Sequence, residues 1–102
     1  MNAVKVQYTV KKEFVETNKA NIRQVMTDLK EIHSKEIIYS AFLLDDGQTF
    51  VHFVVRVNDD AQRIVSELPS FQEFQRQLKE SGPETPPQAE NLTLADSSSS
   101  FF

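Results

Sequence analysis

Apolar and polar side chains alternate near the start of the chain. Val4, Val6, Tyr8 and Val10 are each separated by one polar residue. Because successive side chains of an extended strand point to opposite faces, this alternation predicts a half-buried strand over residues 4–10.

The spacing of apolar residues then changes from two to three or four. The apolar stripe of this second segment consists of Ile22, Val25, Met26, Leu29 and Ile32. A stripe at this spacing, with charged residues between its members, predicts an amphipathic helix. Thr17 or Asn18 precedes the stripe and is expected to cap the helix by accepting a hydrogen bond from a backbone N–H group.

Two runs rich in β-branched and aromatic residues follow, and the pair Asp46-Gly47 separates them. An Asp-Gly pair between two such runs is a strong signal for a β-hairpin, so residues 37–58 are predicted to form one. A two-residue turn at this pair places Tyr39 opposite Val54 on the neighbouring strand.

The second half of the chain carries helix-start and helix-stop signals. Residues 58–60 are predicted to cap a second helix, and Pro69 is expected to break or kink it because proline supplies no backbone donor. Ser70 and Glu73 match the capping-box pattern, which predicts a new helix start at Ser70. Gly82 is expected to terminate that helix.

The C-terminal part of the chain is predicted to be mostly extended. Residues 83–87 contain three prolines and predict a connection without regular structure. Residues 91–96 predict a short last strand, which the nearby prolines place at a sheet edge. Residues 97–102 form a Ser-rich tail outside the single domain predicted for residues 1–96. The final Phe101-Phe102 is either a frayed end or an apolar plug against a partner subunit.

The order strand, helix, strand, strand, helix, strand predicts an α+β, ferredoxin-like βαββαβ fold, with an antiparallel sheet and both helices on one face. The hairpin face predicted to lie beneath the helices consists of Ile38, Phe42, Leu44, Val51, Phe53, Val55 and Val57. The face predicted to stay open consists of Ile37, Tyr39, Ala41, Leu43, Phe50, His52, Val54 and Arg56, with Gln7 and Thr9 of the first strand beside it. A soluble monomer rarely leaves such an apolar face in water, so the chain is expected to form a homodimer through it.

Composition and charge exclude several classes of function. The net charge of −4 argues against general nucleic-acid binding, which depends on basic side chains at phosphates. The chain has no cysteine, so disulfides and thiolate chemistry are excluded. Two histidines without ligand spacing predict no metal site, and two glycines cannot build a phosphate-binding loop. No apolar run is long enough to cross a membrane and no signal-peptide pattern is present, so a cytoplasmic location is expected.

The predicted topology, the segment Leu68-Pro69-Ser70-Phe71-x-x-Phe74 and a late strand after a proline-containing connection together resemble the dimeric α+β barrel superfamily. Within it, the chain is similar to the antibiotic-biosynthesis-monooxygenase-like proteins, over nearly its whole length. The resemblance implies a homodimer with a small-molecule cavity. Some members of the superfamily perform oxygen chemistry on an electron-rich substrate without metal or flavin, and others bind haem or have no known activity. The Trp that such monooxygenases commonly use has no counterpart here, because the chain contains no Trp.

Three polar residues on the predicted open face are candidates for catalysis. His52 is expected to accept or donate a proton, Tyr39 to orient a ligand through its hydroxyl, and Arg56 to hold an anionic oxygen. Each also has a purely structural interpretation, because tyrosine, histidine and arginine side chains are commonly buried or paired at dimer interfaces. The ligand-binding candidates are Phe50, Val54, Leu43, Gln7 and Thr9.

Two functions follow from this set of residues. The first is a dimer that binds a small apolar or aromatic molecule, and the alternative is a cofactor-independent, monooxygenase-like enzyme acting on an electron-rich aromatic substrate. Neither function is expected to require a cofactor.

Overall fold

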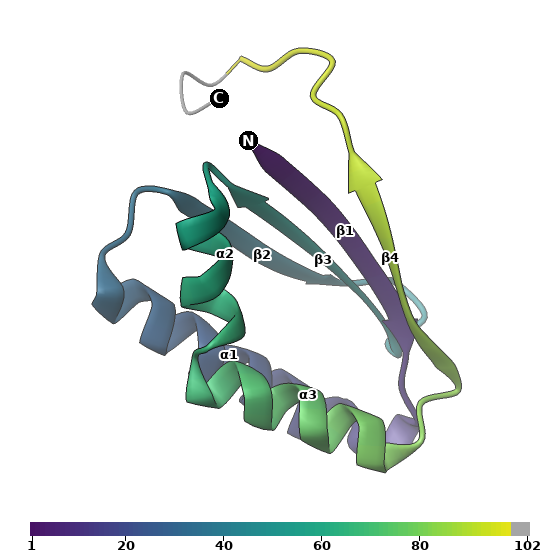
Figure 1. The fold of residues 1–102 in the computed structure, drawn as a ribbon. Helices are drawn as coiled ribbons and strands as arrows, with labels where there is room; N and C mark the ends of the chain where they lie inside the picture. Colours follow the sequence, from purple (N-terminus) through teal and green to yellow (C-terminus); the bar gives the residue numbers. More distant parts are fainter. Residues whose placement is uncertain (99–102) are drawn as a thin grey trace.

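Four strands pair into one antiparallel sheet, and the helices lie together on one side of it (Figure 1). The computed structural model describes residues 1–98. The elements in chain order are β1 (Asn2–Thr9), a 3₁₀ turn (Lys12–Phe14), α1 (Val15–Ile32), β2 (Ile37–Leu43), β3 (Thr49–Arg56), α2 (Asp59–Ser66), α3 (Pro69–Ser81) and β4 (Thr85–Leu92). The strand order is β2-β3-β1-β4. The predicted ferredoxin-like α+β fold is therefore confirmed, with its second helix divided into α2 and α3.

The β2–β3 hairpin has the predicted register, with Tyr39 opposite Val54. Its loop is longer than a two-residue turn, because the outermost bond joins the Leu44 N–H to the Thr49 carbonyl at 2.8 Å. Asp46 closes this loop by accepting hydrogen bonds from the backbone N–H groups of Gln48 and Thr49. Gly47 follows with a φ of 73°, a left-handed conformation that costs glycine little.

The prediction of which hairpin face lies beneath the helices was wrong, and the two faces are exchanged. His52 is only 2% exposed and faces the helices, whereas Phe42 and Phe53 are 56% and 37% exposed on the uncovered face. Tyr8 of β1 lies opposite Phe50 of β3, and residues opposite one another share a face.

The pairing register of β1 with β3 shows that the two faces of the hairpin are exchanged relative to the prediction. Val6, Tyr8, Phe50 and His52 all turn toward the helices, so Tyr39, Leu43 and Val54 do too. Gln7 and Thr9 point the other way, as predicted for β1 itself. The sequence pattern did not separate the two hairpin faces because both are largely apolar.

Helix starts were predicted with mixed success. The prediction for α2 is confirmed, since the Asn58 side chain caps it by accepting from the Ala61 N–H at 2.9 Å. The cap predicted for α1 was wrong: the helix begins at Val15, and Asn18 is a fully buried residue inside it.

The capping box predicted for α3 was also wrong. The helix begins at Pro69, after an extended Leu68, so Ser70 already lies in its first turn. Proline is favoured at a first helical position, where its missing N–H costs nothing. Glu73 accepts hydrogen bonds from Arg76 and Gln77 instead of closing a cap.

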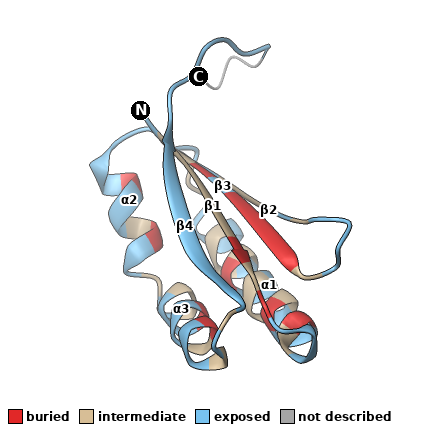
Figure 2. Ribbon diagram, turned by 90° about the vertical axis from the view of Figure 1, so that its right-hand side faces the viewer, coloured by how far each residue is buried: buried red, intermediate tan, exposed pale blue. Residues whose placement is uncertain are grey.

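The last strand begins earlier than predicted. β4 spans Thr85–Leu92, not residues 91–96, and includes Pro86 and Pro87. Its predicted edge position is confirmed, because it pairs with β1 alone within the sheet order. The strand is exposed along its whole length (Figure 2). The terminal Phe101-Phe102, for which two interpretations were offered, lies outside the described residues.

The core lies between the sheet and the helices α1 and α3. It consists of Tyr8, Val10, Val15, Val25, Phe50, Phe74 and Leu78. Among residues 1–98, no helix is both long and apolar enough to cross a membrane. The core thus includes a tyrosine, Tyr8, whose buried hydroxyl requires a hydrogen-bond partner.

Candidate functional site

Three strands and one helix bring four polar side chains together inside the molecule. The hydroxyl of Tyr8 lies 2.8 Å from Nε2 of His52, and the hydroxyl of Tyr39 lies 2.7 Å from Nδ1 of the same ring. Asn18 of α1 donates from Nδ2 to the Tyr8 hydroxyl at 2.9 Å. We call Asn18, Tyr8, His52 and Tyr39 the polar chain, since each is hydrogen-bonded to the next.

The sheet fixes the order of this polar chain. His52 lies on β3 between β1 and β2, with Val6 on one side and Ala41 on the other. Tyr8 and Tyr39 are each two residues along from these neighbours, and the side chains of such diagonal pairs in a sheet can reach one another. His52 therefore meets one tyrosine on each side.

Aromatic rings from α3 close over the polar chain. Phe74 stacks on the His52 ring with centroids 5.6 Å apart, and Phe71 meets Tyr39 edge-on at 6.3 Å. On the sheet itself, Tyr8 stacks on Phe50 at 5.6 Å. These rings keep water from the inner groups, so their hydrogen bonds are made within the protein.

Burial controls the protonation of the polar chain. It lowers the pKa of His52 from 6.5 to about 4, because a buried imidazolium loses its hydration. Burial likewise raises the pKa of Tyr8 above its ordinary value, and the hydrogen bond from Asn18 partly offsets this. The pKa of Tyr39 is raised by burial first and by the nearby Tyr8 second. At neutral pH all three groups are uncharged.

A neutral imidazole donates from one nitrogen and accepts at the other, so the direction of the polar chain depends on the tautomer of His52. In the tautomer protonated at Nδ1, Tyr8 donates to Nε2 and Nδ1–H donates to the Tyr39 oxygen, so Tyr39 keeps its hydroxyl hydrogen for a further acceptor. In the tautomer protonated at Nε2, the Tyr39 hydroxyl donates to Nδ1 and Nε2–H donates to the Tyr8 oxygen.

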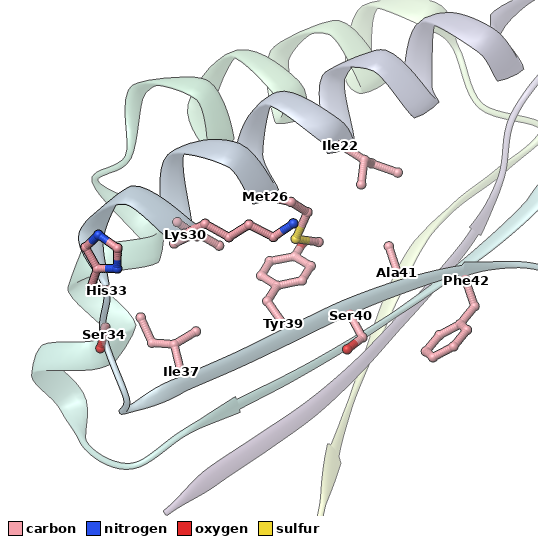
Figure 3. Close-up of a pocket in the computed structure, with 11 residues that line it drawn as sticks. Ile22, Met26, Lys30, His33, Ser34, Ile37, Tyr39, Ser40, Ala41 and Phe42 are labelled. Carbon is pink, nitrogen blue, oxygen red and sulfur yellow. The ribbon is translucent and has the colours of Figure 1, made fainter.

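Tyr39 also forms part of the wall of a large cavity. This cavity, of about 800 Å³, lies between α1 and β2 and is called the α1–β2 cavity below (Figure 3). It is lined by Ile22, Met26, Leu29, Lys30, His33, Ser34, Ile37, Tyr39, Ser40, Ala41 and Phe42. Its volume is in the usual range for small-molecule sites.

Two smaller cavities also include Tyr39 in their walls. One of about 100 Å³ is lined by Tyr8, His52 and Phe71 among others, and one of about 140 Å³ by Val54 and Arg56 among others. Tyr39 is therefore a residue on which three cavities converge. Within the described part of the chain, no group of three or more potential metal ligands occurs.

The structure brings some of the predicted site residues together and separates others. Tyr39 and His52 are in direct contact, as described above. Arg56 shares one small cavity with Tyr39 and Val54, but its guanidinium donates from Nη2 to Asn2 Oδ1 at 3.0 Å.

The remaining ligand-binding candidates are not members of the polar chain, although the Phe50 ring stacks on Tyr8. Leu43 and Phe50 line a neighbouring cavity of about 270 Å³ beside α1. Gln7 and Thr9 face the opposite side of the sheet, and the Thr9 hydroxyl lies 2.8 Å from that of Thr49.

Sequence reasoning missed two members of the polar chain. Tyr8 was interpreted as one apolar position of an alternating strand, and Asn18 as a helix cap. A signal for Asn18 was present, because it lies four residues before Ile22 and so continues the apolar stripe of α1. A polar residue on the buried stripe of a helix requires a buried partner, which here is Tyr8.

Solved structures described as antibiotic biosynthesis monooxygenases share this ferredoxin-like α+β fold. No family model and no curated protein matches the sequence. Solved structures match the fold over nearly the full chain, which confirms the predicted resemblance at the level of the fold.

Three of these structures illustrate the likeness. An antibiotic biosynthesis monooxygenase is 13% identical with a TM-score of 0.75, over 94% of this chain and 100% of that one. Rv0793 from Mycobacterium tuberculosis is 17% identical with a TM-score of 0.77, over 96% and 98%. A mutant of SnoaB, a cofactor-independent oxygenase from Streptomyces nogalater, is 12% identical with a TM-score of 0.70, over 94% of both chains. At these identities the likeness concerns the fold, and it assigns no residue's role.

Proposed function

We propose that this chain binds a small aromatic molecule in the α1–β2 cavity. The observation that supports this most is the placement of Tyr39, whose side chain lines the cavity while its hydroxyl is held at 2.7 Å by the buried His52. Apolar walls with a few fixed polar groups are typical of ligand sites. Ile22, Met26 and Leu29 of α1 supply such a wall.

Titration of the purified protein with 2-naphthol and 1,4-dihydroxybenzene, followed by calorimetry, tests this proposal. Ala41 lines the cavity, so Ala41→Phe fills part of it and is expected to weaken binding at least tenfold. Ala20→Phe is the matched control, because Ala20 is exposed on α1 and lines none of the cavities described. Full binding by Ala41→Phe, or no binding by the wild-type chain, would contradict the proposal.

A second candidate function is cofactor-independent oxygen chemistry on an electron-rich aromatic substrate, in which the substrate itself supplies the electrons for O₂. The hydrogen bonds of His52 favour this candidate, since the ring links the Tyr39 hydroxyl at the cavity wall to the buried Tyr8. In the tautomer protonated at Nε2, the free lone pair of Nδ1 accepts a proton passed inward by Tyr39. SnoaB, which shares the fold, is described as a cofactor-independent oxygenase.

Oxygen uptake with a panel of quinols and polyphenols separates the two candidates. An enzyme is expected to consume oxygen with at least one substrate, and His52→Gln is expected to abolish uptake while Ala20→Phe retains it. Binding without any uptake across the panel leaves only the binding function.

We also infer that two copies of the chain associate through the uncovered face of the sheet. The face available for this is the one that carries the exposed side chains of Ile38, Phe42, Leu44, Phe53 and Val57, called the open face below. Apolar burial contributes roughly 25 cal/mol per Å², so covering several such side chains favours association by several kcal/mol. A two-fold axis pairs this surface with itself, so a second copy is its natural complement.

A further inference from the structure

The α1–β2 cavity differs in charge from the rest of the chain. The chain has 15 acidic and 11 basic side chains, yet none of the described residues that line this cavity is acidic. Lys30 is the one lysine or arginine among them, and His33 lies nearby at the C-terminus of α1. An aromatic ring alone does not require a cation in the wall of its site.

Lys30 is unpaired within the described residues 1–98. The ion pairs of the structure involve Lys5, Lys19, Arg63 and Arg76, and none involves Lys30. Its side chain extends into the space between α1 and β2, and its amine points toward Met26 and Tyr39 (Figure 3). A cation that faces a cavity without a partner favours an anion there.

Polar and apolar side chains both line the cavity. His33 and Ser34 lie at one end beside Ile37, and Ile22, Ala41 and Phe42 lie at the other beside Ser40, with Lys30 and Tyr39 between them (Figure 3). A molecule with an apolar ring and a polar group is able to contact side chains of both kinds.

Tyr39 adds a second polar group to the wall of the cavity. In the tautomer of His52 protonated at Nδ1, the ring donates to the Tyr39 oxygen and the hydroxyl hydrogen of Tyr39 is left for an acceptor. A hydroxyl that donates and an ammonium group both complement an oxygen that is negatively charged.

We propose that the ligand of the α1–β2 cavity is an aromatic acid, whose carboxylate binds Lys30 while its ring contacts the apolar wall of α1. This inference rests on the proposed binding function and specifies the chemical class of the ligand. Lys30 is thus the residue that determines specificity for the charged ligand over its neutral analogue.

A purely structural role for Lys30 is the competing explanation. Lys30 lies in the last turn of α1, where a positive charge stabilises the helix end by complementing its dipole. Lys79 occupies the equivalent last turn of α3 and does not line the α1–β2 cavity. Lys79→Gln is therefore a matched control for the loss of a helix-end lysine.

The test compares two ligands that share a ring system, 6-hydroxy-2-naphthoate and 2-naphthol, by calorimetry at low ionic strength. The wild-type chain is expected to bind the naphthoate at least tenfold more tightly. Lys30→Gln is expected to remove this preference by lowering the affinity for the naphthoate to that for 2-naphthol, and Lys30→Glu to reverse it. Lys79→Gln is expected to keep it.

Each of the other outcomes refutes a specific part of the proposal: the acid specificity, the role of Lys30 or the binding function itself. Equal affinity of the wild-type chain for both ligands refutes the acid specificity and leaves the binding function in place. A preference that survives Lys30→Gln refutes the role of Lys30. Binding of neither ligand refutes both this inference and the proposed function. Thermal unfolding of each variant shows that the fold is retained, so the measured affinities refer to a folded chain.

Discussion

The two faces of the sheet differ in the opposite way to the simple expectation that polar side chains face water and apolar side chains are buried. The face beneath the helices contains the polar chain, with His52 almost fully buried, while the open face exposes Phe42 and Phe53. Polar groups are buried at low cost where each finds a hydrogen-bond partner, and apolar groups remain outside where nothing covers them. The helices determine this difference, because α1 brings Asn18 to Tyr8 and α3 brings Phe74 to His52.

The largest expected effect comes from deleting the centre of the polar chain. His52→Ala removes a hydrogen-bond partner from two tyrosine hydroxyls, leaves Tyr8 with Asn18 alone and opens a cavity. It is therefore expected to lower the free energy of unfolding by on the order of 4 kcal/mol. Urea denaturation measures this loss. His33→Ala is the control, because His33 is exposed at the end of α1 and its replacement is expected to cost less than about 1 kcal/mol. Equal losses for the two variants would contradict the role of the polar chain.

The next effect is a dependence of stability on pH. The folded state holds His52 with a pKa of about 4 against 6.5 in the unfolded chain, so the unfolded chain binds the proton more tightly. Stability from this group is therefore complete above pH 6.5 and is lost as pH falls toward 4, by about 3 kcal/mol in total. Denaturation curves recorded between pH 7 and 4 measure it. His52→Gln is expected to show a flatter pH dependence over this range, and an unchanged slope would show that other groups are responsible.

A smaller effect distinguishes the two tyrosines of the polar chain. Tyr39→Phe removes one hydrogen bond to His52 and is expected to cost about 1 kcal/mol of unfolding free energy. Tyr8→Phe removes two hydrogen bonds inside the core, one to Nε2 of His52 and one to Asn18, so it is expected to cost about 2 kcal/mol. Chemical denaturation of both variants measures the difference. A greater loss for Tyr39→Phe would mean that the outer end of the polar chain supports the fold more than the inner end.

The smallest effect on the fold is expected on the open face. Phe42→Ser is expected to change the stability of a single folded chain by no more than about 0.5 kcal/mol, because Phe42 is already exposed. Its effect should appear in association, with the mass of two chains reduced to that of one at micromolar concentration in sedimentation velocity. Leu94→Ser, which removes an exposed apolar side chain outside the sheet, should leave the mass unchanged. A wild-type mass of one chain would refute the dimer.

The sequence predicted those features that depend on local signals. Asp46-Gly47 determined the register of the hairpin, and Asn58 marked the start of α2. The capping-box pattern at Ser70 was misleading because Pro69, whose fixed φ suits the first helical position, begins the helix one residue earlier.

The site was harder to predict than the fold. Tyr39 and His52 were identified as candidates, but the face on which they lie was not, since both hairpin faces are apolar and only contacts with α1 and α3 distinguish them. Those contacts join residues far apart in sequence, such as His52 and Tyr8, and no local pattern in a single sequence reports them.

The prolines of β4 restrict how this sheet can meet another one. An exposed strand edge is a template on which further chains can add by backbone hydrogen bonds, a common route to aggregation. Pro86 and Pro87 are adjacent in β4 and neither has an amide hydrogen, so whichever of them faces outward offers no donor to an incoming strand. β2 forms the opposite edge and contains no proline. Aggregation by strand addition is thus expected to start at β2, where a single proline would be the most direct way to suppress it.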